Sequence, residues 1–171
     1  MTITLCDSRI ELIPATLNML KTELDPSHSV FGSLDVTEPA YWPPELNDED
    51  SNRFFMSLLE TDPQNVGWSF YYAVDTTRGR KLVGNGGYLG KPSKAGTVEI
   101  GYSILTPFRR QGIATALTRL LVQKAFADAR VHKVLAKTLP GFAPSIGVLL
   151  KMGFIQTDTN DEFSSFELKR P

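Results

Sequence analysis

The chain has 171 residues, 42% of them hydrophobic and 22% charged, which indicates one globular domain over residues 1–171. Its net charge of −1 argues against a general nucleic-acid binder. No run is long and apolar enough to span a membrane, and the N-terminal "MTITLCDSR" lacks the apolar core of a signal peptide. We therefore expect a cytoplasmic protein with no nucleic-acid or membrane partner.

Cysteine and histidine are too scarce for several kinds of site. Cys6 is the only cysteine, which excludes an internal disulfide and a thiolate metal cluster. The two histidines, His28 and His132, stand in unrelated contexts, which excludes a His-rich metal site. They also leave few candidates for the histidine of a Ser-His-Asp triad. We expect no metal ion.

Acidic and basic residues are distributed unevenly. Segment 23–62 holds ten acidic residues and one basic residue, whereas 63–171 holds fifteen Lys or Arg and seven acidic residues. One part of the surface can then repel anions while another attracts them. Scattered solvated charge explains the same pattern equally well.

Hydrophobic periodicity and turn residues predict elements in the order β-α-α-β-β-β-α-β-α-β-β. We expect strands at 9–14, 68–75, 81–90, 96–105, 132–139, 154–158 and 162–169. We expect helices at 15–24, 48–59, 112–127 and 143–152. This order indicates an α+β fold, a mixed sheet of about seven strands with helices on it.

The clearest functional motif is "PFRRQGIAT", residues 107–115, between a strand and the strongest helix. The first N–H groups of a helix lack internal partners, and the helix dipole adds positive charge there. Gly112 and Ala114 leave the backbone approachable, and Arg109 and Arg110 add two charges. The turn therefore predicts a phosphate or pyrophosphate site. A basic turn without a ligand is the alternative.

The surrounding sequence resembles the GNAT superfamily of acetyl-CoA-dependent N-acetyltransferases, on the branch similar to the ribosomal-protein N-terminal acetyltransferases. The family motif Arg/Gln-x-x-Gly-x-Gly/Ala is met by Arg109, Gly112 and Ala114. The later "Ser…Lys-x-Gly-Phe" element is met by Ser145, Lys151, Gly153 and Phe154. The resemblance covers most of the chain and is tightest over 98–154. It implies a GNAT-type, mostly antiparallel and splayed sheet with helices on both faces.

The resemblance also implies where acetyl-CoA binds. Backbone amides of the turn would hold the pyrophosphate, and a bulged preceding strand, splayed from its neighbour, would offer its backbone to the pantetheine arm. The implied cofactor-binding residues are Ile104, Leu105, Arg109, Arg110, Gln111, Gly112, Ile113, Ala114 and Thr115. A free backbone edge suits pantetheine, since its two amides need hydrogen-bond partners.

Acetyl transfer needs a neutral amine, so a base must help to remove a proton. Glu99 is our candidate, as the only acidic residue between Asp75 and Asp128; a structural strand glutamate is equally compatible. Many relatives have a tyrosine acid where this chain has Leu149, and an asparagine where it has Phe142. Ser145 can replace the acid, or it can be the N-cap or first-turn residue of the helix.

The amine acceptor is the least determined component. In this fold the early helices and their loop usually cover the acceptor side, here residues 30–50 of the long irregular segment 25–50. Trp42 and Trp68 are candidates for an amine pocket, and Glu45 can attract a cationic acceptor, although core or lid packing explains the tryptophans as well. Small-molecule amines and peptide N-termini stay open as acceptors, as does a homodimer. A non-enzymatic acyl-CoA-binding or regulatory domain is the alternative function.

Overall fold

The computed structural model describes residues 4–45 and 47–171; residues 1–3 of the N-terminal stretch and residue 46 of the long irregular segment lie outside them. The described chain forms one eight-stranded sheet in the order β1-β2-β3-β4-β5-β6-β8-β7. Its strands are β1 Leu5–Cys6, β2 Ile10–Pro14, β3 Phe70–Asp75, β4 Lys81–Tyr88, β5 Thr97–Ile104, β6 Lys133–Thr138, β7 Ile155–Thr159 and β8 Ser164–Lys169. Neighbours are antiparallel except for the parallel pair β5 and β6, which confirms the mixed, mostly antiparallel sheet.

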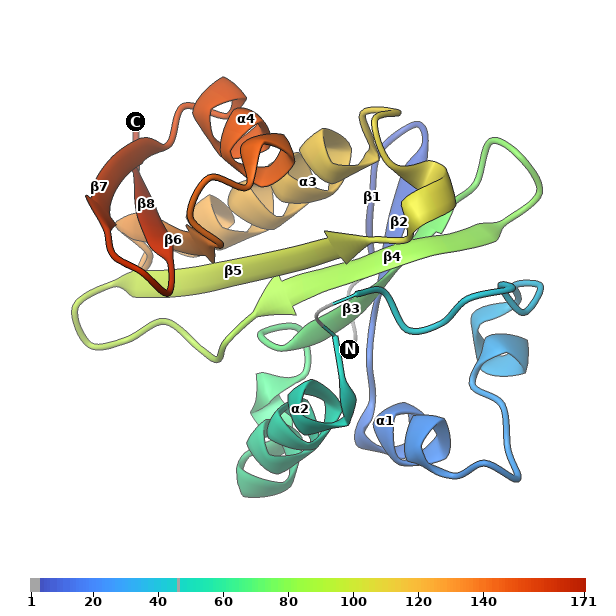
Figure 1. Cartoon of the computed structure of the whole chain (residues 1–171). Coiled ribbons are helices and arrows are strands. Elements are labelled where there is room, and N and C mark those ends of the chain that lie inside the picture. The colour runs from blue at the N-terminus through green and yellow to red at the C-terminus, as the bar shows by residue number, and fades with distance from the viewer. Residues whose placement is uncertain (1–3, 46) are drawn as a thin grey trace.

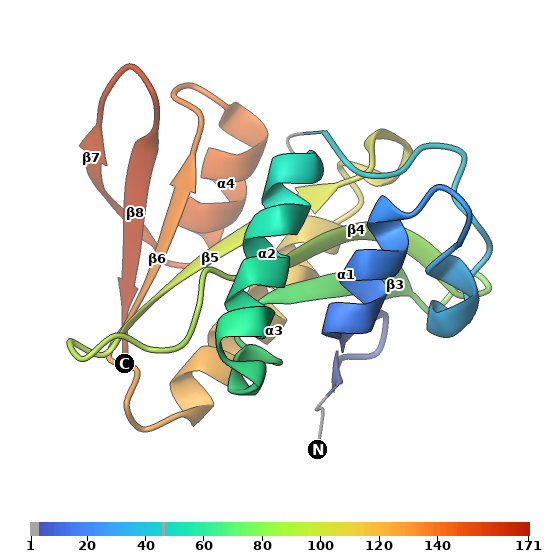
Figure 2. The ribbon, with the colours of Figure 1, turned by 90° about the horizontal axis from the view of Figure 1, so that it is seen from below.

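Helices cover both faces of this sheet, as Figures 1 and 2 show. The α-helices are α1 Leu17–Leu24, α2 Glu49–Thr61, α3 Ile113–Ala127 and α4 Ala143–Lys151. α1 and α2 lie on one face, and α3 and α4 on the other. Short 3-10 helices are η1 Phe31–Leu34, η2 Pro63–Asn65 and η3 Thr106–Phe108. The two faces give the α+β fold two separate hydrophobic cores.

The predicted elements are confirmed, with differences at their ends and one added strand. The short β1 was not predicted, because two residues give no readable alternation; it pairs with β2 through Leu5 and Leu12. α1 and α2 begin later than predicted because Thr16 and Asp48 are their N-caps, accepting hydrogen bonds from helix N–H groups through their side chains.

One core lies under α3 and α4, and the other under α1 and α2. The first includes Ile10, Tyr71, Val98, Ile100, Ile104, Leu117, Leu121 and Leu149. The second includes Leu20, Leu34, Leu59, Phe70 and Tyr72. Since strand side chains alternate, burial of Val98 and Ile100 under α3 turns Glu99 toward the face of α1 and α2.

β5 and β6 separate part-way along their length. Their parallel pairing runs from Thr97 with Lys133 to Ile100 with Ala136 and then stops, although β6 continues to pair with β8. This confirms the splay. The expected bulge in β5 is wrong: its register with β4 is unshifted from Gly84–Ile104 to Tyr88–Ile100. The register shift in this region lies between β3 and β4, beside Ala73 and Val74.

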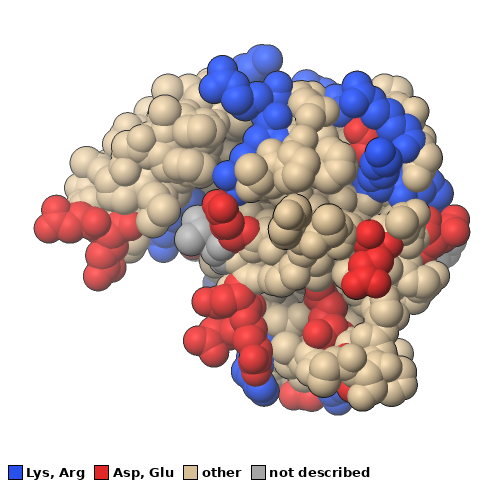
Figure 3. All heavy atoms as spheres, turned by 45° about the vertical axis from the view of Figure 1, so that its right-hand side comes forward, with Lys and Arg blue, Asp and Glu red and all other residues tan. Residues whose placement is uncertain are grey.

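Charges are separated between the two halves of the molecule. In the space-filling view of Figure 3, Lys and Arg gather over the upper half, and most Asp and Glu lie along the middle and in the lower half. The upper half carries α3 and α4, and the lower half carries α1 and α2. Within residues 4–45 and 47–171, no helix combines the length and apolar character needed to cross a membrane.

Candidate active site

The turn between β5 and α3 presents a run of free backbone donors. After η3, Arg109 is extended, and Arg110 and Gly112 have left-handed φ values of 59° and 78°. The N–H groups of residues 110–115 have no hydrogen-bond partner within the part of the chain that the structure describes. The first bond of α3 runs from the Ala116 N–H to the Gly112 carbonyl. These donors and the helix dipole suit an anion with several oxygens.

Gly112 is suited to this turn for two reasons. Its left-handed φ disfavours any residue with a Cβ. A Cβ built there would meet no atom within 4 Å, so the space in front of the turn is open. A ligand can therefore approach the backbone closely at Gly112.

The two arginines of the turn differ. Arg110 is exposed, as an anion site requires. Arg109 instead turns inward: its Nε donates to the Ile104 carbonyl at 3.0 Å and its Nη2 to Glu45 Oε2 at 3.1 Å. Glu45 is thus already paired, which weakens its expected pull on a cationic acceptor. Arg109 links the turn to the irregular segment between α1 and α2.

The free edge of β5 is shifted from its expected place. The Leu105 N–H donates to the Val83 carbonyl, and the Leu105 carbonyl accepts from Phe108. Because backbone groups of an antiparallel strand alternate in direction, Tyr102 and Ile104 direct theirs away from β4, toward the gap left by β6. Beyond Ile100 this side of β5 has no β6 partner. The free edge is therefore Tyr102 and Ile104, not Leu105.

A cleft of about 1210 Å³ joins the turn to the splay and opens to both faces of the sheet. Its walls come from the turn, the ends of β4, β5 and β6, helix α4, the connection between β7 and β8, and the first half of α2. Among the predicted site residues, it is lined by Ile104, Arg109, Arg110, Gly112, Ile113, Ala114, Thr115 and Ser145. Glu99, Leu105, Gln111, Trp42 and Trp68 lie outside this lining.

Glu99 lies on β5 just before the splay, on the face of α1 and α2. Its carboxylate is 3.5 Å from Lys137 Nζ on β6, and its side chain is 24% exposed. Lys137 itself lines the cleft. Glu99 is therefore accessible to water and held beside the opening by a cation from the opposite strand.

Ser145 lies in the first turn of α4, where Phe142 and not Ser145 is the N-cap residue. Its Oγ is 3.1 Å from the Tyr102 hydroxyl, which spans the splay from β5. Burial raises the pKa of Tyr102, which keeps its proton. Leu149 is fully buried in the core and offers no polar group. Tyr102 and Ser145 thus place two hydroxyl groups in a region where Leu149 offers none.

Trp42 and Trp68 occupy packing positions. The ring of Trp42 lies between Phe31 and Tyr72, and its Nε1 donates to Glu23. Trp68 packs against Tyr88 under Lys124, whose Nζ is 3.3 Å from the ring centroid. The structure brings neither ring to the cleft, so the packing alternative accounts for both positions.

Asn85 and Tyr102 are cleft residues that sequence reasoning missed as site residues. Asn85 is 3% exposed, and its Nδ2 has no partner among the described residues. A buried, unpaired amide is costly unless a ligand or water meets it. The polar residue between glycines in "GNGGY" was an available signal for Asn85. For Tyr102 the only signal in the sequence was its place on the apolar face of β5.

A sheet that splays beside a turn with free N–H groups is the arrangement expected of an acetyl-CoA-dependent acyltransferase. Comparison with known proteins supports this class. Residues 14–155 match the family "Acetyltransferase (GNAT) domain", so the chain belongs to the GNAT acetyltransferases. It is an N-acetyltransferase that transfers an acetyl group from acetyl-CoA to an amine. This membership favours the enzyme over the non-enzymatic alternative.

Individual relatives are distant in sequence. An "Uncharacterized N-acetyltransferase YjdG" of Bacillus subtilis is 23% identical over 91% of this chain and 92% of its own. A putative ribosomal-protein-serine acetyltransferase from Vibrio cholerae has a TM-score of 0.67, with 13% identity over 98% of both chains. A spermidine N-acetyltransferase chimera of Vibrio cholerae and hSSAT has a TM-score of 0.64, with 13% identity over 95% of this chain and 96% of its own. One fold thus accompanies different named acceptors.

Proposed function

We propose that the backbone N–H groups of residues 110–115 hold the pyrophosphate of acetyl-CoA, the co-substrate that supplies the acetyl thioester. This proposal rests chiefly on one observation: six successive N–H groups have no partner in the described chain, and all of their residues except Gln111 line the cleft. Gly112 leaves room for phosphate oxygens, and Arg110 adds an exposed positive charge.

The pantetheine arm would lie in the splay, along the free backbone edge of Tyr102 and Ile104. The two amides of pantetheine match the free N–H and C=O groups there, in the manner of an added strand. Arg109 contributes indirectly, since its guanidinium occupies the Ile104 carbonyl and leaves the Ile104 N–H and both groups of Tyr102 for a ligand.

Glu99 would act as the general base on the amine, since it contacts Lys137, which lines the cleft. Because Glu99 itself lies outside the lining, a water molecule would carry the proton to it. Ser145, hydrogen-bonded to Tyr102, would return a proton to the leaving thiolate. A thiol has an ordinary pKa of about 8.5, so the thiolate is a good leaving group and needs no strong acid beside it.

The acceptor would enter from the face of α1 and α2, where the cleft lining includes Asn47, Ser51, Phe55, Phe70 and Asn85. Aromatic walls and buried polar groups suit a primary amine of a small molecule or of a protein N-terminus. Trp42 would support this wall from behind, through its contacts with Tyr72 and Glu23.

Calorimetric titration with acetyl-CoA tests the donor site. We expect saturable binding to the wild type and loss of binding in Gly112→Glu, because the new carboxylate repels phosphate and a Cβ strains the left-handed backbone. Gly32→Ala is the matched control, since its Cβ also meets nothing within 4 Å and it lies outside the cleft. A wild type that does not bind acetyl-CoA would overturn the proposal.

A screen of amines, amino acids, aminoglycosides and peptide N-termini would identify the acceptor class. Each is offered at saturating acetyl-CoA while release of the free thiol is measured. Binding of acetyl-CoA without transfer to any acceptor would favour the non-enzymatic acyl-CoA-binding alternative.

A further inference from the structure

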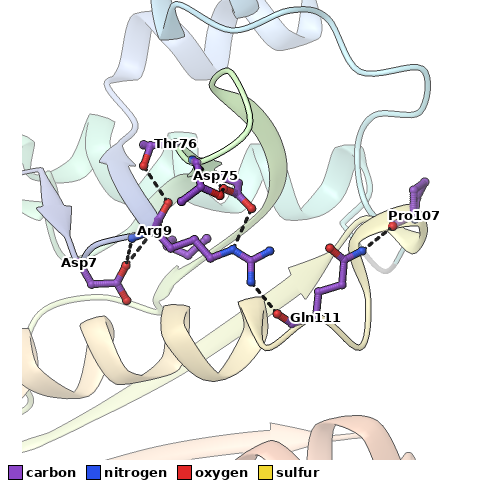
Figure 4. Close-up of polar contacts among 8 residues, drawn as sticks. Asp7, Arg9, Asp75, Thr76, Pro107 and Gln111 are labelled. Atoms are coloured by element: carbon purple, nitrogen blue, oxygen red, sulfur yellow. Dashed lines mark hydrogen bonds and ion pairs between the residues drawn. The ribbon is translucent and has the colours of Figure 1, made fainter.

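Arg9, which directly precedes β2, contacts the turn between β5 and α3 although it lies near the start of the chain. Its Nη1 donates to the Gln111 carbonyl at 2.7 Å, and its Nε donates to Asp75 Oδ2 at 2.9 Å. Figure 4 shows the guanidinium between these two partners. The contact joins β2, β3 and the turn, although Arg9 and Gln111 are 102 positions apart in sequence.

Arg9 is itself held rigidly. Its N–H donates to Asp7 Oδ1 at 2.7 Å, and its carbonyl accepts from the Thr76 N–H at 2.9 Å and the Thr76 Oγ1 at 3.0 Å (Figure 4). Its partner Asp75 has a side chain only 5% exposed. Burial alone would raise the pKa of Asp75, but hydrogen bonds from Thr77 and Arg9 outweigh it and lower the pKa. An ionised, buried carboxylate therefore orients the guanidinium.

The bond to the Gln111 carbonyl determines which way the next N–H points. In a trans peptide the C=O and the following N–H point in opposite directions. With the Gln111 carbonyl directed toward β2, the Gly112 N–H is directed the other way, out of the turn. Arg9 thus contributes to the orientation of a donor that it does not touch.

The same bond keeps a second donor free. The Gln111 carbonyl precedes the Thr115 N–H by four residues, the spacing of an α-helical hydrogen bond. In the structure this carbonyl accepts from Arg9, and the Thr115 N–H has no partner among the described residues. Without Arg9, α3 could extend back by one bond and consume a donor of the turn.

The turn needs such support because its backbone is strained. Arg110 has a φ of 59°, a left-handed conformation that is unfavourable for a residue with a side chain. Gln111 has one more anchor, the bond from its Nε2 to the Pro107 carbonyl at 3.0 Å (Figure 4). That bond lies within the turn, whereas Arg9 ties the turn to the sheet.

We propose that Arg9 is a positioning residue for the donor site: through the Gln111 carbonyl it holds the turn in the conformation that presents free N–H groups to the pyrophosphate of acetyl-CoA. This inference rests on the proposed function of the turn. The arginine fork makes two directed bonds, which the single ammonium of lysine cannot reproduce in the same geometry.

The test compares wild type, Arg9→Gln and Arg9→Lys by calorimetric titration with coenzyme A. We expect the dissociation constant to rise about tenfold in Arg9→Gln, the effect of losing one charge-assisted hydrogen bond. Arg9→Lys should also weaken binding, and it preserves the charge if Arg9→Gln fails to fold. Arg53→Gln is the control, an exposed arginine paired with Glu49 on α2 outside the cleft lining, and it should bind as the wild type does.

A second measurement separates positioning from general stability. Backbone amide NMR signals of the ligand-free variants should change at residues 111–115 and stay unchanged in β6 and β8. Unchanged coenzyme A affinity, or signal changes spread across the sheet, would overturn the inference. If the wild type itself fails to bind coenzyme A, the proposed function fails, and the local NMR effect still reports whether Arg9 holds the turn.

Discussion

Glu99 and Ser145 show what single residues contribute at the cleft. Glu99 projects from β5 toward α1 and α2 with Lys137 as its partner, while Ser145 is on the other side of the splay with Tyr102. The proposed proton acceptor thus lies beside the cleft on one face of the sheet, and the proposed proton donor lines the cleft on the other. This arrangement suits a reaction in which a proton leaves the amine on one face and another reaches the thiolate on the other.

Replacing the proposed base should slow catalysis without weakening donor binding. In Glu99→Gln we expect turnover at neutral pH to fall about a hundredfold, within the usual contribution of general base catalysis. The coenzyme A dissociation constant should stay near that of the wild type, because Glu99 lies outside the cleft lining. Steady-state kinetics with the acceptor found in the screen, and calorimetry, measure the two quantities.

Glu167→Gln is the matched control for this variant. Glu167 is also a strand glutamate paired with a lysine, Lys133 at 3.2 Å, and its side chain is 21% exposed. It lies on β8, away from the cleft lining. Equal turnover in Glu99→Gln and wild type would remove Glu99 as the base.

At the scale of elements, β4 is the strand against which both β5 and α3 pack. Its "GNGGY" segment, residues 84–88, lies in close contact with its neighbours. A Cβ at Gly84 would lie 2.3 Å from the Ser103 carbonyl oxygen of β5, and one at Gly86 would lie 2.8 Å from Leu117 of α3. The glycines let β5 and α3 pack closely on β4, which places the turn between them.

A methyl group at Gly84 should therefore destabilise the protein. We expect Gly84→Ala to lower the free energy of unfolding by about 1–3 kcal/mol, the usual cost of overpacking, because the obstacle is rigid backbone. Urea denaturation measures the change. Gly32→Ala, with no atom within 4 Å of its Cβ, should show no such loss. Comparable stability of Gly84→Ala and wild type would contradict this view of the β4–β5 contact.

At the scale of the whole molecule, Glu23 joins the elements on the face of α1 and α2, the proposed acceptor side. This carboxylate, on α1, accepts hydrogen bonds from Trp42 of the irregular segment, Asn52 of α2 and Tyr72 of β3. Burial, the largest effect, raises the pKa of Glu23, and the three hydrogen bonds only partly oppose it. The wall of the proposed acceptor chamber is thus assembled around one partly buried acid.

Glu23 should make stability depend on pH. Because its pKa in the folded state is above the unfolded value of 4.5, its contribution is full below that value and is lost as pH rises through the folded pKa. The free energy of unfolding of the wild type should therefore fall, relative to Glu23→Gln, as pH rises from 4 upward. Denaturation curves at several pH values measure this difference.

Glu60→Gln provides the comparison, since Glu60 is an exposed partner of Lys21 on the same face. Its curve should follow that of the wild type. A constant difference between Glu23→Gln and wild type at all pH values would show that Glu23 does not titrate in this way.

Local sequence determined the helices and strands and the turn between β5 and α3. Three signals each depend on residues close together in sequence: the alternation in β5, the apolar stripe of α3 and the left-handed conformation that Gly112 favours. They can therefore be recognised in the sequence alone. The free N–H groups follow from any helix start without a side-chain cap. The fold and the class of donor were therefore predictable.

Tertiary structure decided what long-range contacts control. Which edge of β5 is free depends on where β6 leaves it, after Ile100. Arg109 turns inward because it bonds to Glu45 and to the Ile104 carbonyl. Trp42 and Trp68 lie outside the cleft lining, packed against Tyr72 and Tyr88. Arg9 reaches Gln111 across 102 positions. Such partners are set by packing of the whole sheet, and no short segment encodes them.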